Sequence, residues 1–423
     1  MPADNPGPGS GDTGRPSRRG SAPDAMSGVL TVAHVIHSLG PGGAEGVLVD
    51  LARAAPSAGI RVVVVGLSDE HTDEGVVDNR AVPPLRDLGA TVHELHTGRY
   101  DLTGVHRLAR LIRAEKVDIV HTHLKHADVV GGAAARLAGV PSVSTLHIID
   151  IPTTRMHRLR VKMGLFARRH LSSRVIALSS AQLRWYATNS GDDESIVLLP
   201  NGIGEPQVSV DPAVIRSEMG VSEGALLAVC ISLMRPEKGH ADLLGAVRLL
   251  PADLPLVLAL AGDGPLLDSI RSTVDSDPAL QNRVRVLGFR GDAADLIAAS
   301  DFVVHPSLED ALPTALISAL AGARPIVATN VGGIPDIVGP GCGLLVEPGR
   351  PLALSAGIAE MISTEVNDPA AYEQMCRRAR ARYESKFCAD IWLKNLRTLY
   401  TAAIAAQQRR RRRWCRGEGT EAF

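Results

Sequence analysis

The sequence predicts an α/β protein made of two doubly wound parallel sheets. Short apolar runs alternate with longer amphipathic segments over most of the 423 residues, and strands that alternate with helices in this way form parallel βαβ units. Near the middle of the chain, residues 199–206 are dense in proline and glycine, which is typical of a linker between domains. We therefore expect two Rossmann-like domains with a cleft between them.

The expected strands form one series on each side of this linker. The apolar runs of the two series are residues 32–36, 61–67, 117–120, 141–145 and 174–178, and then residues 226–232, 256–261, 283–287, 302–305 and 325–328. Farther on, residues 391–406 have apolar side chains at roughly helical spacing. A helix with an apolar stripe needs a groove to cover it, so we expect this helix to pack back on the first domain.

These patterns also set the expected domain boundaries. Residues 1–28 are rich in Pro, Gly, Ser and Asp and contain no apolar segment of the signal-peptide kind, which predicts a disordered tail. The further expected units are a first domain at 29–204, a second domain at 205–388, a returning helix at 389–406 and a basic disordered tail at 407–423. Five consecutive arginines at 409–413 make this tail basic, and blocks of like charge are usually solvated.

The composition argues against several classes of protein. The formal net charge is -1, so no overall field attracts nucleic acid, and no aromatic platform or basic domain accompanies the arginine run. The five cysteines form no C-x-x-C pair, which argues against a zinc site or a disulfide framework and favours a cytoplasmic protein. The longest apolar stretches have about half of the roughly 20 residues that cross a bilayer.

Charged residues follow two of the expected strands in the second domain. Arg235 and Lys238 come after the first strand of that series, and Glu309 and Asp310 come after the fourth. Open α/β sheets bind ligands at the carboxyl ends of their strands, where two cations can hold a diphosphate and a carboxylate can bind sugar hydroxyls. The alternatives are solvated surface charges and an acidic helix cap. Together the two motifs favour a nucleotide-sugar site.

A glycine-rich loop follows the first expected strand of the chain. Gly42 and Gly43 stand just before a helix-like segment, where bare backbone N–H groups and the positive end of the helix can approach a phosphate. The loop is not G-x-G-x-x-G, because Glu45 stands where the last glycine would be. A simple tight turn is the alternative interpretation.

Histidines end two expected strands of the first domain. His121 and His123 follow one strand, and His147 follows the next. Three histidines near one sheet edge could hold a metal ion, but no carboxylate or cysteine stands beside them at ligand spacing. A contact with a sugar or a packing role is favoured, and no metal is expected.

A basic and apolar segment follows His147. Residues 151–191 contain eight Lys and Arg residues and no acidic residue, and the density of cations is highest at 155–169, from Arg155 to Arg169. This mixture suits a helix that lies on an anionic membrane surface. It equally suits an ordinary helix with a buried stripe and a solvated basic face. Peripheral contact with the inner face of a membrane is therefore one of two interpretations.

Seven motifs in order make the chain resemble a family 4 glycosyltransferase of the glycosyltransferase-B fold. They span about residues 29–405 and are specific as a set, although each alone is weak. The motifs are Gly42-Gly43-Ala44-Glu45, Leu199-Pro200-Asn201-Gly202, Arg235-x-x-Lys238-Gly239, Ala261-Gly262-Asp263-Gly264-Pro265, Leu287-Gly288-Phe289, Glu309-Asp310-x-Leu312-Pro313 and Val331-Gly332-Gly333-Ile334-Pro335.

The resemblance implies an acceptor domain followed by a nucleotide-sugar domain, and transfer with retention of anomeric configuration without a cofactor or metal. It implies that Arg235 and Lys238 bind the diphosphate, that His147 reaches the donor sugar, and that Asp310 is the first acid of the family's E-x7-E pattern. The residues that it assigns to the donor site are Gly42, Gly43, Gly288, Phe289, Arg290, Glu309, Thr314, Ala315 and Ser318.

One departure from the family pattern concerns Ser318, which stands where the second acid of E-x7-E is expected. A serine can bind one ribose hydroxyl, but the charge-assisted bond, about twice as strong as a neutral one, is lost. We expect a hexosyltransferase type of enzyme that acts on a glycan, lipid-linked or small-molecule acceptor in polysaccharide or glycoconjugate synthesis. The alternatives are a non-catalytic member that binds a nucleotide sugar or glycan, and a nucleotide-sugar epimerase.

Overall fold

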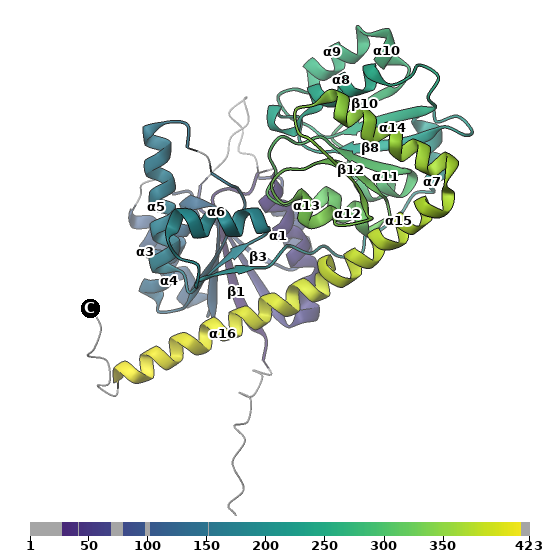
Figure 1. Cartoon of the computed structure of the whole chain (residues 1–423). Coiled ribbons are helices and arrows are strands. Elements are labelled where there is room, and N and C mark those ends of the chain that lie inside the picture. The colour runs from purple at the N-terminus through teal and green to yellow at the C-terminus, as the bar shows by residue number, and fades with distance from the viewer. Residues whose placement is uncertain (1–27, 41, 69–78, 98–101, 151, 416–423) are drawn as a thin grey trace, which may run out of the picture.

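Two parallel sheets, each covered by helices on both faces, make up the protein (Figure 1). The computed structural model describes residues 28–415 apart from residues 41, 69–78, 98–101 and 151. The expected tail therefore lies, up to residue 27, outside the described residues. The fold class predicted from the sequence is confirmed.

The first sheet has the strand order β3-β2-β1-β4-β5-β6-β7, with every pair parallel. Its strands are β1 Leu30–Ile36, β2 Ile60–Gly66, β3 Thr91–Glu94, β4 Ile119–His123, β5 Ser142–Thr145, β6 Arg174–Ala177 and β7 Ile196–Leu198. The helices of this domain are α1 Gly43–Ala54, η1 Ala55–Ala58, α2 Val82–Asp87, α3 Leu102–Ala114, α4 Lys125–Ala138, α5 Arg155–Leu171 and α6 Ser180–Ser190. The central strand β1 is fully buried, as expected for a sheet covered on both faces.

The second sheet has the order β10-β9-β8-β11-β12-β13 and is also parallel throughout. Its strands are β8 Leu226–Ile231, β9 Leu256–Ala261, β10 Val284–Gly288, β11 Phe302–His305, β12 Ile326–Thr329 and β13 Gly343–Val346. Its helices are α7 Pro212–Glu218, η2 Pro236–Lys238, α8 His240–Leu249, α9 Leu267–Asp275, α10 Pro278–Gln281, α11 Ala293–Ala299, α12 Thr314–Ala321, α13 Ile334–Val338, α14 Pro351–Asn367 and α15 Pro369–Arg382.

Each apolar run that was expected to be a strand overlaps one, and three further strands were not predicted from the sequence. The missed strands are β3, β7 and β13, which lie at sheet edges. They are three or four residues long and largely half-buried or exposed. An edge strand needs no continuous apolar run, so it leaves a weak signal in the sequence.

The chain crosses between the domains twice, and the two crossings lie side by side. Ile203 donates its N–H to the carbonyl of Phe387 at 3.0 Å, and Ala389 donates to the carbonyl of Ile203 at 2.8 Å. The hydroxyl of Tyr383, in the turn η3 Tyr383–Phe387, also donates to the Ile203 carbonyl, at 3.1 Å. The expected boundaries at residues 204 and 388 fall at this double crossing and stay a prediction.

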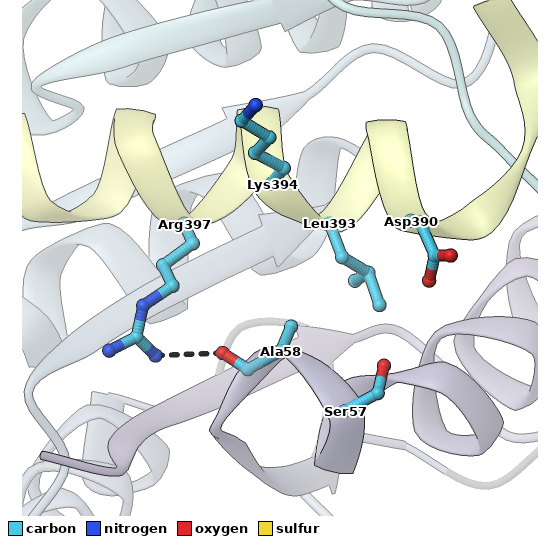
Figure 2. A pocket seen from close by; sticks show the side chains of 6 residues that line it. All are labelled: Ser57, Ala58, Asp390, Leu393, Lys394 and Arg397. Carbon is cyan, nitrogen blue, oxygen red and sulfur yellow. Dashed lines mark hydrogen bonds between the residues drawn. The ribbon is translucent and has the colours of Figure 1, made fainter.

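The long helix α16, Ala389–Cys415, returns to the first domain, as expected. Leu393 and Leu396 are buried, and Figure 2 shows Arg397 reaching from α16 to η1, where it donates to the carbonyl of Ala58 at 2.8 Å. A small open hollow where α16 meets η1 is lined by Ser57, Ala58, Asp390, Leu393, Lys394 and Arg397 (Figure 2). Within the described residues no helix is both long enough and apolar enough to cross a bilayer.

The structure corrects the expected disordered tail at 407–423. Residues 407–415 continue α16, and residues 416–423 lie outside the described residues. Gln407 and Arg411 both donate to the carbonyl of Gly139, at 2.9 and 2.6 Å, at the end of α4. Cations are also favourable near the carboxyl end of a helix. The run of arginines is therefore part of the helix and not of a disordered tail.

We predict that Gly202→Ala weakens the double crossing. An added Cβ would lie 2.7 Å from Cβ of Trp392 and 2.9 Å from the carbonyl oxygens of Phe387 and Cys388. Overpacking of this kind costs about 1–3 kcal/mol, measurable by denaturant unfolding. Gly204→Ala, in the same linker, is the matched control because its added Cβ meets no atom within 4 Å. Equal stability of the two variants would contradict the packing argument.

Candidate active site

The candidate residues lie where the strand order of each sheet reverses direction. In the first sheet this switch point is between β1 and β4, and in the second it is between β8 and β11. Gly42 follows β1, and His123 ends β4. Lys238 follows β8, and Asp310 follows β11. Open α/β sheets bind ligands at such points, beyond the carboxyl ends of the strands.

The carboxyl ends of the two sheets face each other at the junction of the domains. Ser180, which follows β6, donates its N–H and its hydroxyl to the carboxylate of Asp336, which follows β12, at 2.6 and 3.0 Å. Figure 1 accordingly shows α6 and α13 at the facing sides of the two domains. The two switch points therefore open toward the same junction.

An ion pair joins the two charged motifs of the second domain. Nζ of Lys238 lies 2.6 Å from Oδ2 of Asp310. His305 at the end of β11 binds the same oxygen through Nε2 at 3.0 Å, and the hydroxyl of Ser307 donates to it at 3.3 Å. The side chain of Asp310 is 11% exposed. The loops after β8 and β11 thus meet at one carboxylate.

The contacts of Asp310 keep its carboxyl group ionised. Burial alone raises the pKa of this group, but the hydrogen bond and electrostatic interaction with His305, together with Lys238, outweigh burial and lower the pKa to about 2. The contacts of His305 and Ser307 with Asp310 were not predicted from the sequence. Their position directly at a strand end was the available signal.

Two glycines let neighbouring loops approach Asp310 closely. Gly239 has φ of +68°, and an added Cβ would lie 2.1 Å from the carbonyl oxygen of Pro306. Gly332 has φ of +51°, and an added Cβ would lie 1.7 Å from the carbonyl oxygen of Asp310. Such a backbone conformation with such close contacts requires glycine. The close approach of these loops therefore explains the glycine in two of the sequence motifs, at positions 239 and 332.

The other expected donor residues of the second domain differ in their availability. Arg235 is exposed, and its side chain has no hydrogen-bond or ion-pair partner within the residues that the structure describes. Phe289 follows Gly288 at the end of β10 and is 72% exposed. Glu309 is exposed as well. Arg290, in contrast, is engaged by two carboxylates of its own domain.

Arg290 binds Asp292 at 2.6 Å and Glu218 at 2.5 Å. The hydrogen bonds to Asp292 and then to Glu218 raise the pKa of the Arg290 guanidinium. This side chain is therefore held by its own domain, and its expected place beside the base stays a prediction.

Helix α12 brings three further expected residues to this edge. Thr314 and Ala315 open the helix, so their N–H groups lack partners inside the helix. The hydroxyl of Ser318 donates to the carbonyl of Thr314 at 3.2 Å. Ser318 is thus turned to its own helix, and no contact brings it to Asp310 within the described residues.

The glycine loop of the first domain has one residue with open space around it. Gly42 precedes α1 and Gly43 begins it. An added Cβ on Gly42 would lie 2.2 Å from the carboxylate of Glu45, whereas one on Gly43 would meet no described atom within 4 Å. The fold itself therefore leaves room at Gly43.

The histidines of the first domain lie together around the switch point. Nδ1 of His34, in β1, is 3.0 Å from Nε2 of His123, and Nδ1 of His123 is 2.8 Å from Nε2 of His147. His121 binds the hydroxyls of Tyr400 and Thr145, both at 2.6 Å. Sequence analysis missed His34, because its neighbours become apparent only when the strand order places β1 beside β4.

These histidines are neutral near pH 7. Burial lowers the pKa of His34 to about 3, and burial with the charge of Arg168 lowers that of His147 to about 4. Burial is also the main cause that holds the pKa values of His121 and His123 well below 6.5. One nitrogen each of His34, His121 and His123 lies within 4.8 Å of the others, so a metal is geometrically conceivable, and its expected absence stays a prediction.

We predict that Asp310→Asn lowers stability at pH 7 by about 2 kcal/mol, from the shift of its pKa from 3.8 to about 2. Because the pKa is lower in the folded state, the contribution of Asp310 is fully present above pH 4 and is lost as the pH falls toward about 2. Denaturant unfolding of both proteins should therefore show a difference that shrinks over this window. A difference that is constant with pH would contradict the ion pair.

The chain matches known families and proteins over most of its length. Residues 41–204 match the model described as Glycosyltransferase Family 4, and residues 225–364 match Glycosyl transferases group 1. The chain is 27% identical over 249 residues to the UDP-Gal:alpha-D-GlcNAc-diphosphoundecaprenol alpha-1,3-galactosyltransferase of Escherichia coli, covering 55% of this chain and 63% of that enzyme. It is 27% identical over 335 residues to the N-acetyl-alpha-D-glucosaminyl L-malate synthase of Bacillus anthracis, covering 76% and 85%.

Solved structures share the fold. Alr3699/HepE of Anabaena, in complex with UDP-glucose, has a TM-score of 0.75 at 23% identity, over 88% of this chain and 100% of that chain. A glycosyltransferase of Rickettsia africae has a TM-score of 0.73 at 19% identity, over 89% and 98%. The two family models and the two facing parallel sheets bear out the resemblance of the seven motifs: the chain belongs to glycosyltransferase family 4 and has the glycosyltransferase-B fold.

Proposed function

We propose that the chain transfers a sugar from a nucleotide-diphosphate sugar to an acceptor, with retention of anomeric configuration. The observation that carries the proposal is the arrangement of Lys238, paired with the ionised Asp310, and Arg235, exposed and unpaired within the described residues, at the switch point of the second sheet. Two cations at this position suit a diphosphate, and the carboxylate beside them suits sugar hydroxyls.

The arrangement fits the charges that develop in such a reaction. Breaking the bond between the sugar and the phosphate builds positive charge on the sugar ring and negative charge on the departing diphosphate. Fixed cations on the phosphate side stabilise that transition state without a side-chain nucleophile. Lys238 would then bind both the diphosphate and Asp310, while Arg235 would turn from solvent to the phosphates.

Backbone groups complete the proposed phosphate site. Thr314 and Ala315 open α12, where their N–H groups have no partner inside the helix, and the positive end of a helix favours an anion. From the first domain, Gly43 offers backbone with no side chain and with room beside it. Because no described atom of the protein requires a glycine there, close approach of a ligand is a reason for one.

The proposed donor has a uridine base. The Escherichia coli relative is named for UDP-Gal, and Alr3699/HepE was solved with UDP, and with UDP-glucose. Phe289, exposed after β10, is the side chain that we assign to the base. Ser318 replaces the second acid, so we expect the ribose to be held less tightly than by a carboxylate.

We predict that Arg235→Ala abolishes the response to the donor without harming the fold. Wild type should gain thermal stability with UDP and UDP-sugars over GDP and ADP, since a ligand at about 100 times its Kd adds about 2.7 kcal/mol. The variant should lose this shift, keep its melting temperature without ligand, and turn over at least about a hundredfold more slowly. Arg377→Ala is the matched control, because Arg377 is 66% exposed on α15 and pairs, among the described residues, only with Glu373.

The other outcomes of these measurements distinguish the proposed transferase from a glycan-binding protein and from an epimerase. An undiminished shift and turnover in Arg235→Ala would sink the assigned site. A wild type that shifts with no nucleotide would favour a member that binds glycans without transfer. Release of free nucleotide diphosphate with a new glycoside supports the transferase, whereas a nucleotide sugar that changes only in its configuration supports an epimerase.

We further propose a lipid-linked acceptor, presented at a membrane surface that binds α5. The Escherichia coli relative is named for a diphosphoundecaprenol-linked sugar. On α5 four apolar side chains at helical spacing are 47–65% exposed, and we call them the α5 face: Met156, Leu159, Met163 and Phe166. Exposed cations flank this face: Arg155, Arg158, Arg160, Lys162 and Arg169. Such a helix suits the headgroup region of an anionic bilayer.

The opposite side of α5 is anchored, so the α5 face is held outward. Val161 and Leu165 are buried, and Arg168 pairs with Asp128 of α4 at 2.7 Å in the interior. The hydroxyl of Thr154 caps the first turn by accepting from the N–H of His157 at 3.1 Å. A buried stripe therefore accounts for some apolar residues of the segment. The α5 face is not covered by it and is available to bind a membrane surface.

We predict that Phe166→Glu reduces co-sedimentation with vesicles of phosphatidylcholine and phosphatidylglycerol severalfold. The change places an acid among cations that each contribute about 1 kcal/mol near an anionic surface. Wild-type binding should fall as salt is raised and be absent with phosphatidylcholine alone. Leu352→Glu, on α14 of the second domain, is the control, because Leu352 is 72% exposed. Equal binding of both variants and wild type would remove α5 from the proposal.

A further inference from the structure

Three imidazole rings of the first domain form a hydrogen-bonded row that ends at the candidate site. The row runs from His34 through His123 to His147, with N–N distances of 3.0 and 2.8 Å. His34 is completely buried, whereas His147 is half-buried. The row therefore connects the interior of the domain with His147, the residue that the family resemblance assigns to the donor sugar.

A row of neutral imidazoles can be protonated in two ways. Each neutral ring has one N–H donor and one acceptor nitrogen, so either every ring donates toward His147 or every ring donates toward His34. The second arrangement puts a proton on Nε2 of His34, which is buried and has no hydrogen-bond partner within the described residues. Among buried backbone groups, an N–H without an acceptor is rarer than an oxygen without a donor, and we apply the same preference to the imidazole nitrogens. The first arrangement is therefore favoured.

In the first arrangement the proton on His147 is on Nδ1. Nε2 of His147 accepts from Nδ1 of His123, so the N–H of the neutral ring is on the other nitrogen. Within the described residues Nδ1 of His147 has no hydrogen-bond partner, and the residue is half-buried. The row thus presents an N–H at its open end.

His121 holds the ring of His123 in place. The two rings stack with centroids 4.3 Å apart and planes 29° from parallel. Both nitrogens of His121 are occupied, one by the hydroxyl of Tyr400 on α16 and the other by that of Thr145 on β5. With its own ring fixed by both neighbours, His121 supports His123 from one side.

We propose that His123 is a positioning residue that fixes His147 as the Nδ1–H tautomer, so that His147 donates a hydrogen bond to a hydroxyl oxygen of the donor sugar. This inference rests on the proposed function and on the family resemblance, which assigns His147 to the donor sugar. His147 is then an uncharged hydrogen-bond donor, and His34 and His123 together hold its proton on Nδ1.

The first test reads the tautomer without any activity. Nitrogen NMR of the full chain labelled at histidine, with His147→Gln to identify the resonances, should show a protonated Nδ1 and an unprotonated Nε2 on His147 at pH 7.5. The opposite tautomer, or a rapid mixture of both, would overturn the proposal. If wild type transfers no sugar, the proposed function fails, while this measurement still decides the tautomer.

The second test uses a matched pair of substitutions. His123→Asn keeps an amide nitrogen near the position of Nδ1 and can still donate to His147, whereas His123→Gln keeps one near Nε2 and can reach only His34. We expect the Asn variant to retain the tautomer and most of the turnover. The Gln variant should lose the tautomer and about tenfold to a hundredfold of kcat, the usual cost of removing an orienting partner. Equal losses in two folded variants would mean a structural role.

The third test concerns metal. A metal ion bound by both His34 and His123 would take the place of the hydrogen bond between them, so the tautomer argument would no longer hold. Elemental analysis of the purified full chain, before and after incubation with Zn²⁺ and dialysis, should show no stoichiometric metal. A bound equivalent that is lost in His34→Asn would overturn the row of hydrogen bonds and replace it with a metal site.

Discussion

The ion pair between Lys238 and Asp310 is the constraint on which the second domain's site depends. Removing two charges from water is costly, and a buried pair is tolerated when further hydrogen bonds satisfy it. His305 and Ser307 supply those bonds, and the loops that carry all four residues must come close enough to make them. Gly239 and Gly332 permit that approach. The glycines of these motifs are therefore needed to bring the charged residues of the motifs into contact.

The described contacts that orient the first domain relative to the second domain's site do not involve Lys238 or Asp310. The double crossing at Ile203 and the two hydrogen bonds that Ser180 donates to Asp336 fix how the two sheets face each other. Helix α16 adds a third connection, because Tyr400 reaches His121 from a segment that leaves the second domain. The orientation of the histidine row thus depends on residues that follow the second domain in sequence.

The sequence was sufficient to predict the central strands, the two domains and the charged motifs, because buried parallel strands leave continuous apolar runs and ligand residues follow them directly. It was insufficient for β3 and β13, which are half-buried or exposed edge strands without such runs. His34 and His305 were missed for another reason: their roles depend on which strands are neighbours, and a crossover topology does not follow from sequence order. The helical end of α16 was missed because its partner, the carbonyl of Gly139, lies 268 residues away from Gln407.

The two sides of the candidate site differ in charge in a way that suits the proposed reaction. On the phosphate side, Arg235 and Lys238 are cations, and the lowered pKa of Asp310, about 2, keeps its carboxylate ionised beside them. On the sugar side, burial lowers the pKa of His147 to about 4, so its ring is uncharged at neutral pH. An imidazolium there would repel the positive charge that develops on the sugar ring, whereas a neutral N–H binds a hydroxyl without that penalty. Burial keeps the rings of the histidine row neutral and is therefore compatible with catalysis. The hydrogen bonds along the row orient the N–H of His147 toward the sugar without a charge on the ring.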